Sequence, residues 1–554
     1  MGVSIRSRFV TQKGSHVAEH SRTSSHSTSS HGAAHAAPHH GHPPGYAGHP
    51  HRWRILAVLV LSLLIILMDN TILNVALRTI ADPDKGLGAT QGELEWIVNS
   101  YTLIFGGLLF TWGVFADRQG RKLILLIGFV GFGLSSLAAT LVTTPTQLII
   151  IRGVMGVFGA AVLPSTLAII STVFSTQERP KAIGIWSGAV GAGLAIGPIL
   201  GGFLLDHFHW SSIFLVNVPI CAAAFIACMF VVPESKNPRP GKFDPLGVLL
   251  SVVGLIVLCY GFIRGGEESF GDLIAWGSII GGIVVLVAFT FWERRAANPV
   301  LDITLFRNPS FSASIAAIGI AFFALMGLTF FSAFYLQSVI GLTPFQAGLM
   351  LLPLAAGQMI AGPTSPIWVR RFGAKRVSAV GIFVLAIAML GFAAFQVDSS
   401  LIIVGIDFAI IGFAMGLVMP PATTAILASV PPEKTGAGSA VSSVSRQVAA
   451  ALGVAIIGSA TSAVYKANIL PSLSAVPDQF RDLAAGSVQA TLVFAEKFNN
   501  TAVALEAKQA YVSAMHVGAV ISTIVALLGV IAVLRWMPGK LSPKVTGAPT
   551  TVEA

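Results

Sequence analysis

Charged side chains are scarce in this sequence, since Asp, Glu, Lys and Arg together make up only 10% of its 554 residues. A soluble globular chain carries about 25% charged residues, so this chain has too few to cover a water-facing surface. Hydrophobic residues make up 54%, the mean hydropathy is +0.78, and apolar runs of about 20 residues, the length that crosses a hydrocarbon core, recur along the chain. The composition excludes a string of soluble domains and predicts an all-α integral membrane protein.

Cysteine and the sequence motifs of enzymes are also scarce. The three cysteines, Cys221, Cys228 and Cys259, all fall in apolar runs, so we expect small buried hydrophobic residues rather than a disulfide or metal framework. The sequence has no P-loop for ATP and no His-Glu-x-x-His or Gly-x-Ser-x-Gly pattern for hydrolysis. These absences predict a protein that is not an enzyme, needs no metal or cofactor, and draws its power from an ion gradient.

Residues 1–52 form a segment rich in Ser, His, Gly and Pro that holds ten of the thirteen histidines. Such a composition cannot bury enough apolar area to fold, so we predict a disordered cytoplasmic tail. Metal binding by its imidazoles is the alternative, although their spacing fits no defined site. The segment has no apolar core of a signal peptide, and the first spanning helix is expected to direct its own insertion.

Fourteen apolar segments follow the tail and predict fourteen transmembrane helices. They lie near residues 55–79, 94–115, 122–142, 147–171, 182–205, 212–232, 245–264, 272–292, 312–339, 346–369, 376–396, 401–429, 437–462 and 514–537. Of the 34 Lys and Arg residues, 25 fall in the tails and even-numbered loops and seven in the odd-numbered loops. Positive loops stay in the cytoplasm, so both termini are expected there. The protein itself is expected in the cell (inner) membrane. The net charge of +10 is explained by this bias and implies no nucleic-acid partner.

A faint internal repeat relates two of the predicted cytoplasmic turns. Aligning Gly120 with Gly373, an offset of 253, also aligns Arg118 with Arg371 and Lys122 with Lys375. Two related six-helix halves with a pair of helices inserted between them explain this repeat. We therefore predict a 6 + 2 + 6 arrangement with a first bundle at 53–233, the inserted pair and linker at 234–310, a second bundle at 311–540 with an external loop at 463–513, and a cytoplasmic tail at 541–554.

The turn between the second and third predicted helices combines glycines with charges of both signs. Its residues are Gly113, Asp117, Arg118, Gly120, Arg121 and Lys122. Glycine permits a tight turn, and the Asp and Arg side chains can form charge-assisted hydrogen bonds that hold the cytoplasmic face. A merely solvated positive loop would explain the basic residues but not the glycines and the aspartate. The turn resembles the signature loop of the major facilitator superfamily, which implies a cytoplasmic gate here.

The fifth predicted helix carries small residues at regular spacing. They are Gly184, Gly193, Gly197, Pro198, Gly201 and Gly202. Glycines four residues apart form a smooth stripe for close helix packing, and a proline can kink the helix. Packing alone could account for such a stripe. The whole pattern, however, resembles the antiporter motif of the drug-exporting branches of that superfamily.

Further motifs across residues 55–537 resemble the fourteen-helix drug:proton antiporters, the EmrB/QacA-like multidrug exporters. They include Met68-Asp69-Asn70-Thr71-Ile72-Leu73-Asn74-Val75-Ala76-Leu77, Glu95-Trp96 with Tyr101, Trp210 with Ile213-Phe214 and Asn217-Val218-Pro219, and Tyr335-Leu336-Gln337. The first motif normally ends in proline, where this chain has Arg78, and Ser211-Ser212 depart from the usual residues after Trp210. The resemblance implies a substrate cavity that includes Asn74, Trp96, Tyr101, Tyr335 and Gln337.

Four charged residues inside predicted helices need an explanation, because a charge there is costly and normally has a partner or a function. Asp69 is expected about 21 Å along the first helix, and Arg152 about 8 Å from the outer end of the fourth, which runs the other way. Their depths coincide, so we predict that Asp69 exchanges a proton under the control of Arg152; a fixed structural ion pair is the alternative. Asp407 is either a second titrating or cation-binding carboxylate or a residue at the outer rim. The side chain of Arg446 either extends to the cytoplasm or lines the cavity.

The resemblance implies proton-coupled efflux of amphiphilic, drug-like compounds by alternating access. The partners are then the substrate, protons and the lipid bilayer, with a periplasmic adaptor and outer-membrane channel in a Gram-negative cell. A dedicated exporter of one metabolite, lipid or siderophore would share every motif, and a non-transporting membrane sensor is an alternative of another class. Aromatic residues of the ninth predicted helix either stack on cargo or face lipid; they are Phe322, Phe323, Phe330, Phe331, Phe334 and Tyr335.

Overall fold

The computed structural model describes residues 48–537, apart from residue 176, 238–243, 297–298, 300, 431–434, 476–480 and 482–483. A few more side chains, at 180, 184, 187–192, 194, 435–437 and 475, are not described. The predicted tails therefore lie almost wholly outside the described residues. All the regular secondary structure of the described residues is helical.

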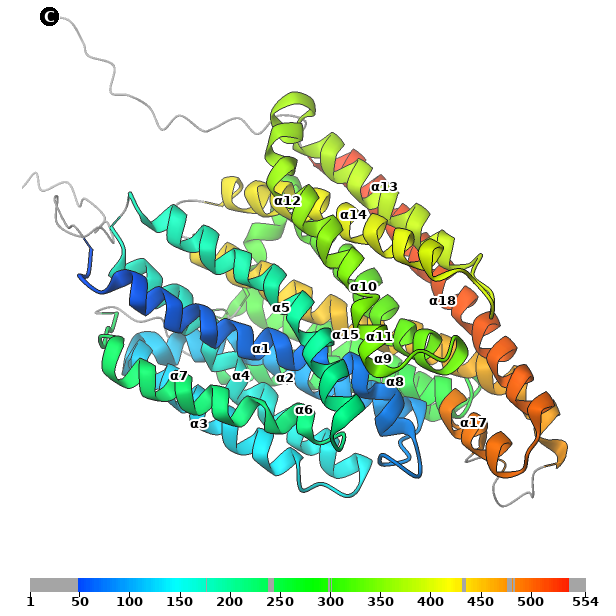
Figure 1. Ribbon diagram of the computed structural model, residues 1–554. Helices are drawn as coiled ribbons and strands as arrows, with labels where there is room; N and C mark the ends of the chain where they lie inside the picture. The colour runs from blue at the N-terminus through cyan, green and yellow to red at the C-terminus, as the bar shows by residue number, and fades with distance from the viewer. Residues whose placement is uncertain are drawn as a thin grey trace, which may run out of the picture. The chain divides into compact units, whose positions relative to one another are not determined.

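The helices follow the order of the predicted segments (Figure 1). The first half contains α1 (Arg52–Ala81), α2 (Gln91–Gln119), α3 (Arg121–Ala139), α4 (Pro145–Val173), α5 (Arg179–His207), α6 (Ser212–Leu215) and α7 (Asn217–Val231). The predicted inserted pair corresponds to α8 (Pro245–Glu267) and α9 (Leu273–Arg295), followed by the 3-10 turn η1 (Ile303–Arg307). The second half contains α10 (Pro309–Phe334), the π-helical turn η2 (Tyr335–Val339), α11 (Pro344–Leu349), α12 (Leu352–Phe372), α13 (Ala374–Phe392), α14 (Leu401–Ala428), α15 (Thr435–Ile469), the 3-10 turn η4 (Leu470–Ala475), α17 (Val488–Lys497) and α18 (Thr501–Trp536).

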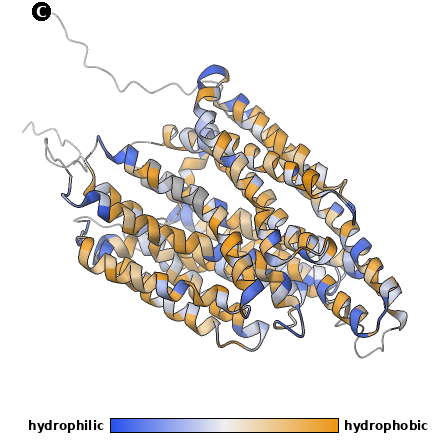
Figure 2. Ribbon diagram, in the orientation of Figure 1, coloured by the Kyte–Doolittle hydropathy of each residue, from blue (hydrophilic) through white to orange (hydrophobic). Residues whose placement is uncertain are grey.

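Thirteen helical spans in the described residues are long and apolar enough to cross a membrane. The fifth predicted segment corresponds to α5, a further helix of 29 residues, so a helix stands at each of the fourteen predicted positions. Apolar residues cover the long helices and polar residues gather near their ends (Figure 2). The predicted all-α membrane fold is confirmed.

Polar caps explain where several of these helices begin. A side-chain oxygen of the residue before the helix accepts a backbone N–H of the first turn and so satisfies an otherwise unpaired donor. The capping residues are Thr90, Thr144, Asp244, Asp272, Asn308, Thr343 and Ser400. Proline follows directly in four of these cases, where its fixed φ suits the first helical turn and its missing N–H costs nothing.

The predicted repeat appears in the structure as two matching helix junctions. Gly120 lies between α2 and α3 with φ +131°, and Gly373 lies between α12 and α13 with φ +84°. The amide of Gly120 donates to the carbonyl of Ala116 and that of Gly373 to the carbonyl of Val369, again an offset of 253. Both positions require glycine, because other residues rarely adopt a positive φ of this size.

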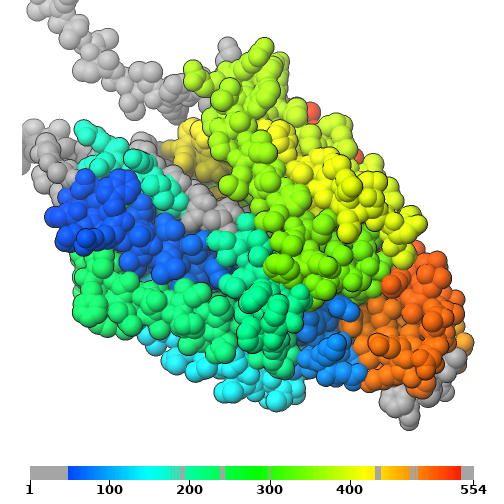
Figure 3. Space-filling model, in the orientation of Figure 1, coloured from blue at the N-terminus to red at the C-terminus, as the bar shows by residue number. Residues whose placement is uncertain are grey.

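The connection between α15 and α18 is shorter and more helical than the predicted external loop at 463–513. Helix α15 continues to Ile469 and α18 begins at Thr501, and the described part of the connection holds η4 and α17. A helix can continue beyond the bilayer through polar residues such as Glu506 and Lys508, so hydropathy underestimates the length of α18. Figure 3 shows the orange segment that includes α17 packed beside the blue loop that joins α1 to α2.

Hydrogen bonds between described residues join the two halves at one end of the structure. We name the end that carries the α1–α2 connection the loop-1 end, and the end that carries Gly120 the loop-2 end. Seven hydrogen-bonded pairs between described residues of the halves lie toward the loop-1 end; the pairs are Gln337–Val75, Thr343–Asp206, Ser459–Glu95, Arg78–Gln489, Gln489–Asp82, Lys497–Asp84 and Gln91–Gly486. Helices α2 and α15, and α5 and α11, pack directly across this seam. The structure is therefore closed at the loop-1 end.

Candidate functional site

Asp69 of α1 and Arg152 of α4 form an ion pair inside the first half. The Nη1 atom of Arg152 lies 2.5 Å from Oδ2 of Asp69, and both side chains are 1% exposed or less. The structure thus brings together the two residues whose predicted depths coincide. A buried pair of this kind is stable only while both charges are matched, because removing one partner leaves an uncompensated charge.

Neighbouring groups hold both members of the pair. Asn217, the first residue of α7, donates its side-chain amide to the other carboxylate oxygen of Asp69 at 2.9 Å. Arg152 donates through Nε to the carbonyl of Ile97, and its guanidinium lies 4.3 Å from the centre of the Tyr101 ring. Both Asp69 oxygens therefore accept a donor, so proton uptake by Asp69 requires that Arg152 or Asn217 move. Asn217 belongs to a recognised motif, but only the fold assigns it to this carboxylate.

The glycine stripe of α5 packs directly against the part of α1 that carries Asp69. A Cβ atom added at Gly193 would lie 2.7 Å from Cβ of Leu67, and one at Gly201 would lie 3.2 Å from the side chain of Ile72. At Gly197 an added Cβ would overlap the side chain of Thr71. The predicted close packing is confirmed at these three positions.

The same helix also approaches the second half. An added Cβ at Gly202 would lie 2.5 Å from Cα of Phe345, and one at Gly348 would meet the carbonyl of Pro198. Pro198 lies inside α5, as expected, whereas the surroundings of Gly184 fall outside the described set. Helix α5 therefore links the ion-pair region to the closed seam.

The turn from Gly113 to Lys122 forms the expected charge-assisted bonds, but within the first half. Arg121 donates to Oδ1 of Asp117 at 2.8 Å and to the carbonyl of Ala168 in α4. Asn237, after α7, donates its side-chain amide to Oδ2 of Asp117 at 3.2 Å. A Cβ atom added at Gly113 would lie 3.7 Å from the side chain of Pro164. Arg118 is exposed.

Glu234 adds a second anion to this turn that the motif does not contain. It accepts the backbone N–H groups of Lys122 and Leu123 at 3.1 and 3.2 Å, while the Lys122 ammonium donates to the carbonyl of Met229. An added Cβ at Gly120 would lie 2.6 Å from the Glu234 carboxylate. Glu234 therefore caps the start of α3 and requires glycine at position 120 on packing grounds as well.

Asp407 of α14 lies in the second half, away from the Asp69 pair. It is 8% exposed, so it is buried rather than placed at an open rim, and its Oδ2 atom has no hydrogen-bond partner. An added Cβ at Gly391 of α13 would lie 2.7 Å from its Oδ1 atom. The two carboxylates therefore occupy separate environments, one saturated with donors and one poor in them.

The predicted cavity residues do not lie in one place. Asn74 and Gln337 line a small hollow where α1 meets α10 and η2, and Gln337 donates to the carbonyl of Val75 at 2.8 Å. Trp96 instead faces Tyr260 of α8, with ring centres 6.5 Å apart, and Tyr101 lies under Arg152. Tyr335 is fully buried in the second half, stacked on Phe395.

Most of the aromatic residues of α10 and η2 are core residues. Five of the six are 9% exposed or less, namely Phe323, Phe330, Phe331, Phe334 and Tyr335. Lipid contact for most of them is therefore a wrong expectation, because they pack against α13 and α18. The sixth, Phe322, is half-buried and lies 5.8 Å from the guanidinium of Arg446, which binds the hydroxyl of Ser443.

Comparison with known proteins places the chain in a family. The Major Facilitator Superfamily profile matches residues 59–454. The chain is 35% identical over 478 residues to the multidrug efflux pump LfrA of Mycolicibacterium smegmatis, covering 86% of this chain and 94% of that protein. It is 32% identical over 427 residues to the puromycin resistance protein pur8 of Streptomyces alboniger, covering 76% and 84%.

A solved structure supports the fold. A bacterial homologue of the human lysosomal transporter Spinster, in an inward-facing and unoccupied conformation, aligns with a TM-score of 0.63 at 17% identity, covering 89% of this chain and 99% of that one. The relatives are transporters and not enzymes, as expected for this chain. The chain belongs to the Major Facilitator Superfamily.

Proposed function

We propose that this protein exports amphiphilic, drug-like compounds from the cytoplasm in exchange for protons, by alternating access. The observation that carries the proposal is the Asp69–Arg152 pair, a titratable carboxylate and a cation that are both buried, with Asp69 on the stretch of α1 against which the antiporter-like glycine stripe packs. A buried carboxylate whose partners can rearrange is suited to bind and release a proton during a conformational change. Two relatives, a multidrug efflux pump and a puromycin resistance protein, support drug-like cargo.

The orientation is part of the same proposal. The excess of Lys and Arg in the tails and even-numbered loops supports cytoplasmic termini, which makes the loop-1 end external and the loop-2 end cytoplasmic. Closure at the loop-1 end then corresponds to a state that faces the cytoplasm. An adaptor in a Gram-negative cell would have to dock on the connection between α15 and α18, which in this structure packs on the α1–α2 connection through Gln489 and Lys497.

Reconstitution into liposomes with an imposed pH gradient tests the function. Puromycin and a panel of chemically distinct amphiphilic dyes serve as probes, and drug and proton flux are measured together. We expect several probes to move against their gradients with opposite proton movement, and Asp69→Asn to abolish this movement. Transport of a single compound class would indicate a dedicated exporter, and a lack of any gradient-driven flux would contradict the proposal and favour a sensor.

A further inference from the structure

Glu95 is a second buried carboxylate of the first half, and the ion pair of Asp69 does not involve it. It lies one turn into α2, at 1% exposure, and faces α15 of the second half. An added Cβ at Gly458 of α15 would lie only 2.5 Å from its Oε1 atom. Glu95 therefore occupies the seam between the halves, at the end that is closed in this structure.

The charged and titratable groups around Glu95 come from three helices. Glu267 of α8 accepts the hydroxyl of Thr90 at 2.7 Å, and Glu93 of α2 caps the backbone of Thr90. Lys466 of α15 donates its ammonium to the backbone carbonyl of Glu267 rather than to a carboxylate. Cys259 of α8 is buried in an apolar cluster of side chains, against which Trp96 packs. Among the described residues no Lys or Arg forms an ion pair with Glu95, and Arg152 is bound to Asp69.

The hydrogen bond that Glu95 accepts is too long and too shared to stabilise an ionised carboxylate. Its Oε2 atom lies 3.3 Å from Oγ of Ser459 in α15, while the same hydroxyl lies 2.5 Å from the carbonyl of Ala455. A hydroxyl has one proton, and the closer carbonyl takes it. That leaves Oε2 of Glu95 with only a long hydrogen bond from Ser459, and an ionised carboxylate here would be buried without a compensating partner.

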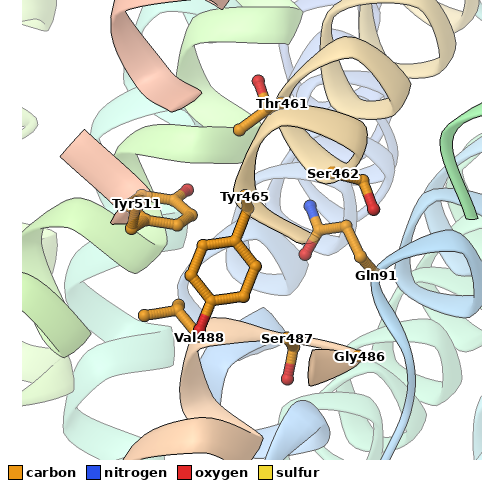
Figure 4. A pocket seen from close by; sticks show the side chains of 8 residues that line it. All are labelled: Gln91, Thr461, Ser462, Tyr465, Gly486, Ser487, Val488 and Tyr511. Atoms are coloured by element: carbon orange, nitrogen blue, oxygen red, sulfur yellow. The ribbon is translucent and has the colours of Figure 1, made fainter. Parts of the chain in front are cut away.

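A small hollow lies one helical turn away from this site. This hollow at the loop-1 end is lined by Gln91, which is four residues before Glu95, and by Ser462, which is three residues after Ser459 (Figure 4). The hollow also includes Tyr465, Ser487 and Tyr511. Separation of α2 from α15 at this point would expose the Glu95 carboxyl to water.

We propose that Glu95 is a proton-binding site at the seam between the halves, protonated while the loop-1 end is closed and ionised when it opens. The inference rests on the proposed function only in that alternating access must open this seam. Proton binding at Glu95 stabilises the closed seam, and the stabilisation is lost as the pH rises. External acid thus favours the state that faces the cytoplasm, independently of proton exchange at Asp69.

Distances across the seam test the proposal without any drug or gradient. Spin labels on cysteines at Lys85 and Phe498, two exposed positions beside the Asp84–Lys497 pair, are introduced after the three native cysteines are replaced by alanine. Distance distributions are measured from pH 5 to pH 9 in detergent and in lipid. We expect the ratio of closed to open conformers to fall by up to about tenfold per pH unit through the transition, the limit for one linked proton.

Three variants make the result specific. Glu95→Gln keeps the shape and cannot ionise, so its distances should stay short at every pH. Ser459→Ala removes the hydroxyl that donates to the Glu95 carboxylate, so opening should begin at a higher pH. Glu267→Gln is the matched control, because it neutralises the neighbouring carboxylate and should keep a pH-dependent transition.

Two results would overturn the inference. One is a pH transition of the same size in Glu95→Gln, and the other is a wild-type protein whose distances do not respond to pH. Either result is distinguishable from failure of the proposed function, because drug export by the same labelled protein is measured in a separate assay with a pH gradient.

Discussion

Arg78 of α1 and Gln489 of α17 share a hydrogen bond across the loop-1 end, with Nε of Arg78 donating to Oε1 of Gln489 at 2.9 Å. The Gln489 amide also donates to Asp82, and its oxygen accepts the hydroxyl of Ser338. Gln489 is 4% exposed, so this network is shielded from water. Arg78 stands where the related motif has proline, and its side chain here anchors the connection between α15 and α18 to the first half.

Gln489→Ala should favour opening of the loop-1 end. It removes three hydrogen bonds and leaves Arg78 without its acceptor, and a buried bond to a charged group contributes about 1.5–3 kcal/mol. The ratio of closed to open conformers, measured by the spin-label distances at pH 6, should fall at least about tenfold. Lys497→Ala is the control, since the pair that it breaks is exposed and contributes little. Equal effects of the two substitutions would contradict a special role for the buried network.

Asp69→Asn should abolish gradient-driven export and also lower protein abundance. The asparagine cannot exchange a proton, and it leaves Arg152 buried without an anion, which costs about 3–5 kcal/mol. The double variant Asp69→Asn/Arg152→Gln should recover abundance but not export. Flux normalised to protein in the membrane separates the two effects, and full export by Asp69→Asn would remove this residue from the proton path and leave Asp407 as the next candidate.

Asp117→Asn should slow transport while the protein still folds. The substitution weakens the bond with Arg121, whereas the backbone bond from Asn237 to the carbonyl of residue 117 survives. Gly120→Ala should be more damaging, because it combines a φ of +131° with a clash at Glu234. Turnover and thermal stability are measured for both variants; normal turnover in Asp117→Asn would show that the charge only marks topology.

Gly197→Ala should lower stability through α1. The new methyl group overlaps the Thr71 side chain, and overpacking of this kind costs about 1–3 kcal/mol. Gly277→Ala in α9 is the matched control, because nothing lies within 4 Å of its added Cβ. Thermal unfolding in detergent should show a lower Tm for the first variant and an unchanged or higher Tm for the second. No difference between them would contradict the close packing of α5 on α1.

Labelling from outside intact cells tests the proposed orientation. A cysteine at Phe498, which is 57% exposed at the loop-1 end, should react with an impermeant thiol reagent. A cysteine at the exposed Gln119, at the loop-2 end, should react only after the membrane is made permeable. The reverse pattern would overturn the assignment of cytoplasmic termini.

The order and placement of the membrane helices could be predicted from the sequence alone. Hydropathy over about 20 residues and a capping residue before the first turn are local properties, so the predicted segments and the helices of the structure coincide closely. The equivalence of Gly120 and Gly373 could also be predicted from the sequence, because both junctions need a residue that tolerates positive φ. The coincidence in depth of Asp69 and Arg152 followed from helix rise and direction.

The neighbours of each side chain were decided by the tertiary structure. Nothing local indicates that Asn217 donates to Asp69, that Trp96 faces α8 while Tyr335 enters the core, or that Glu95 meets Ser459. Residues 364 positions apart, such as Glu95 and Ser459, meet only when helix rotation and the approach of two halves are both set. Every face of these helices is apolar enough for lipid or core, so periodicity carries little information about which face is buried. Close packing at glycines and the matching of buried polar groups make that choice.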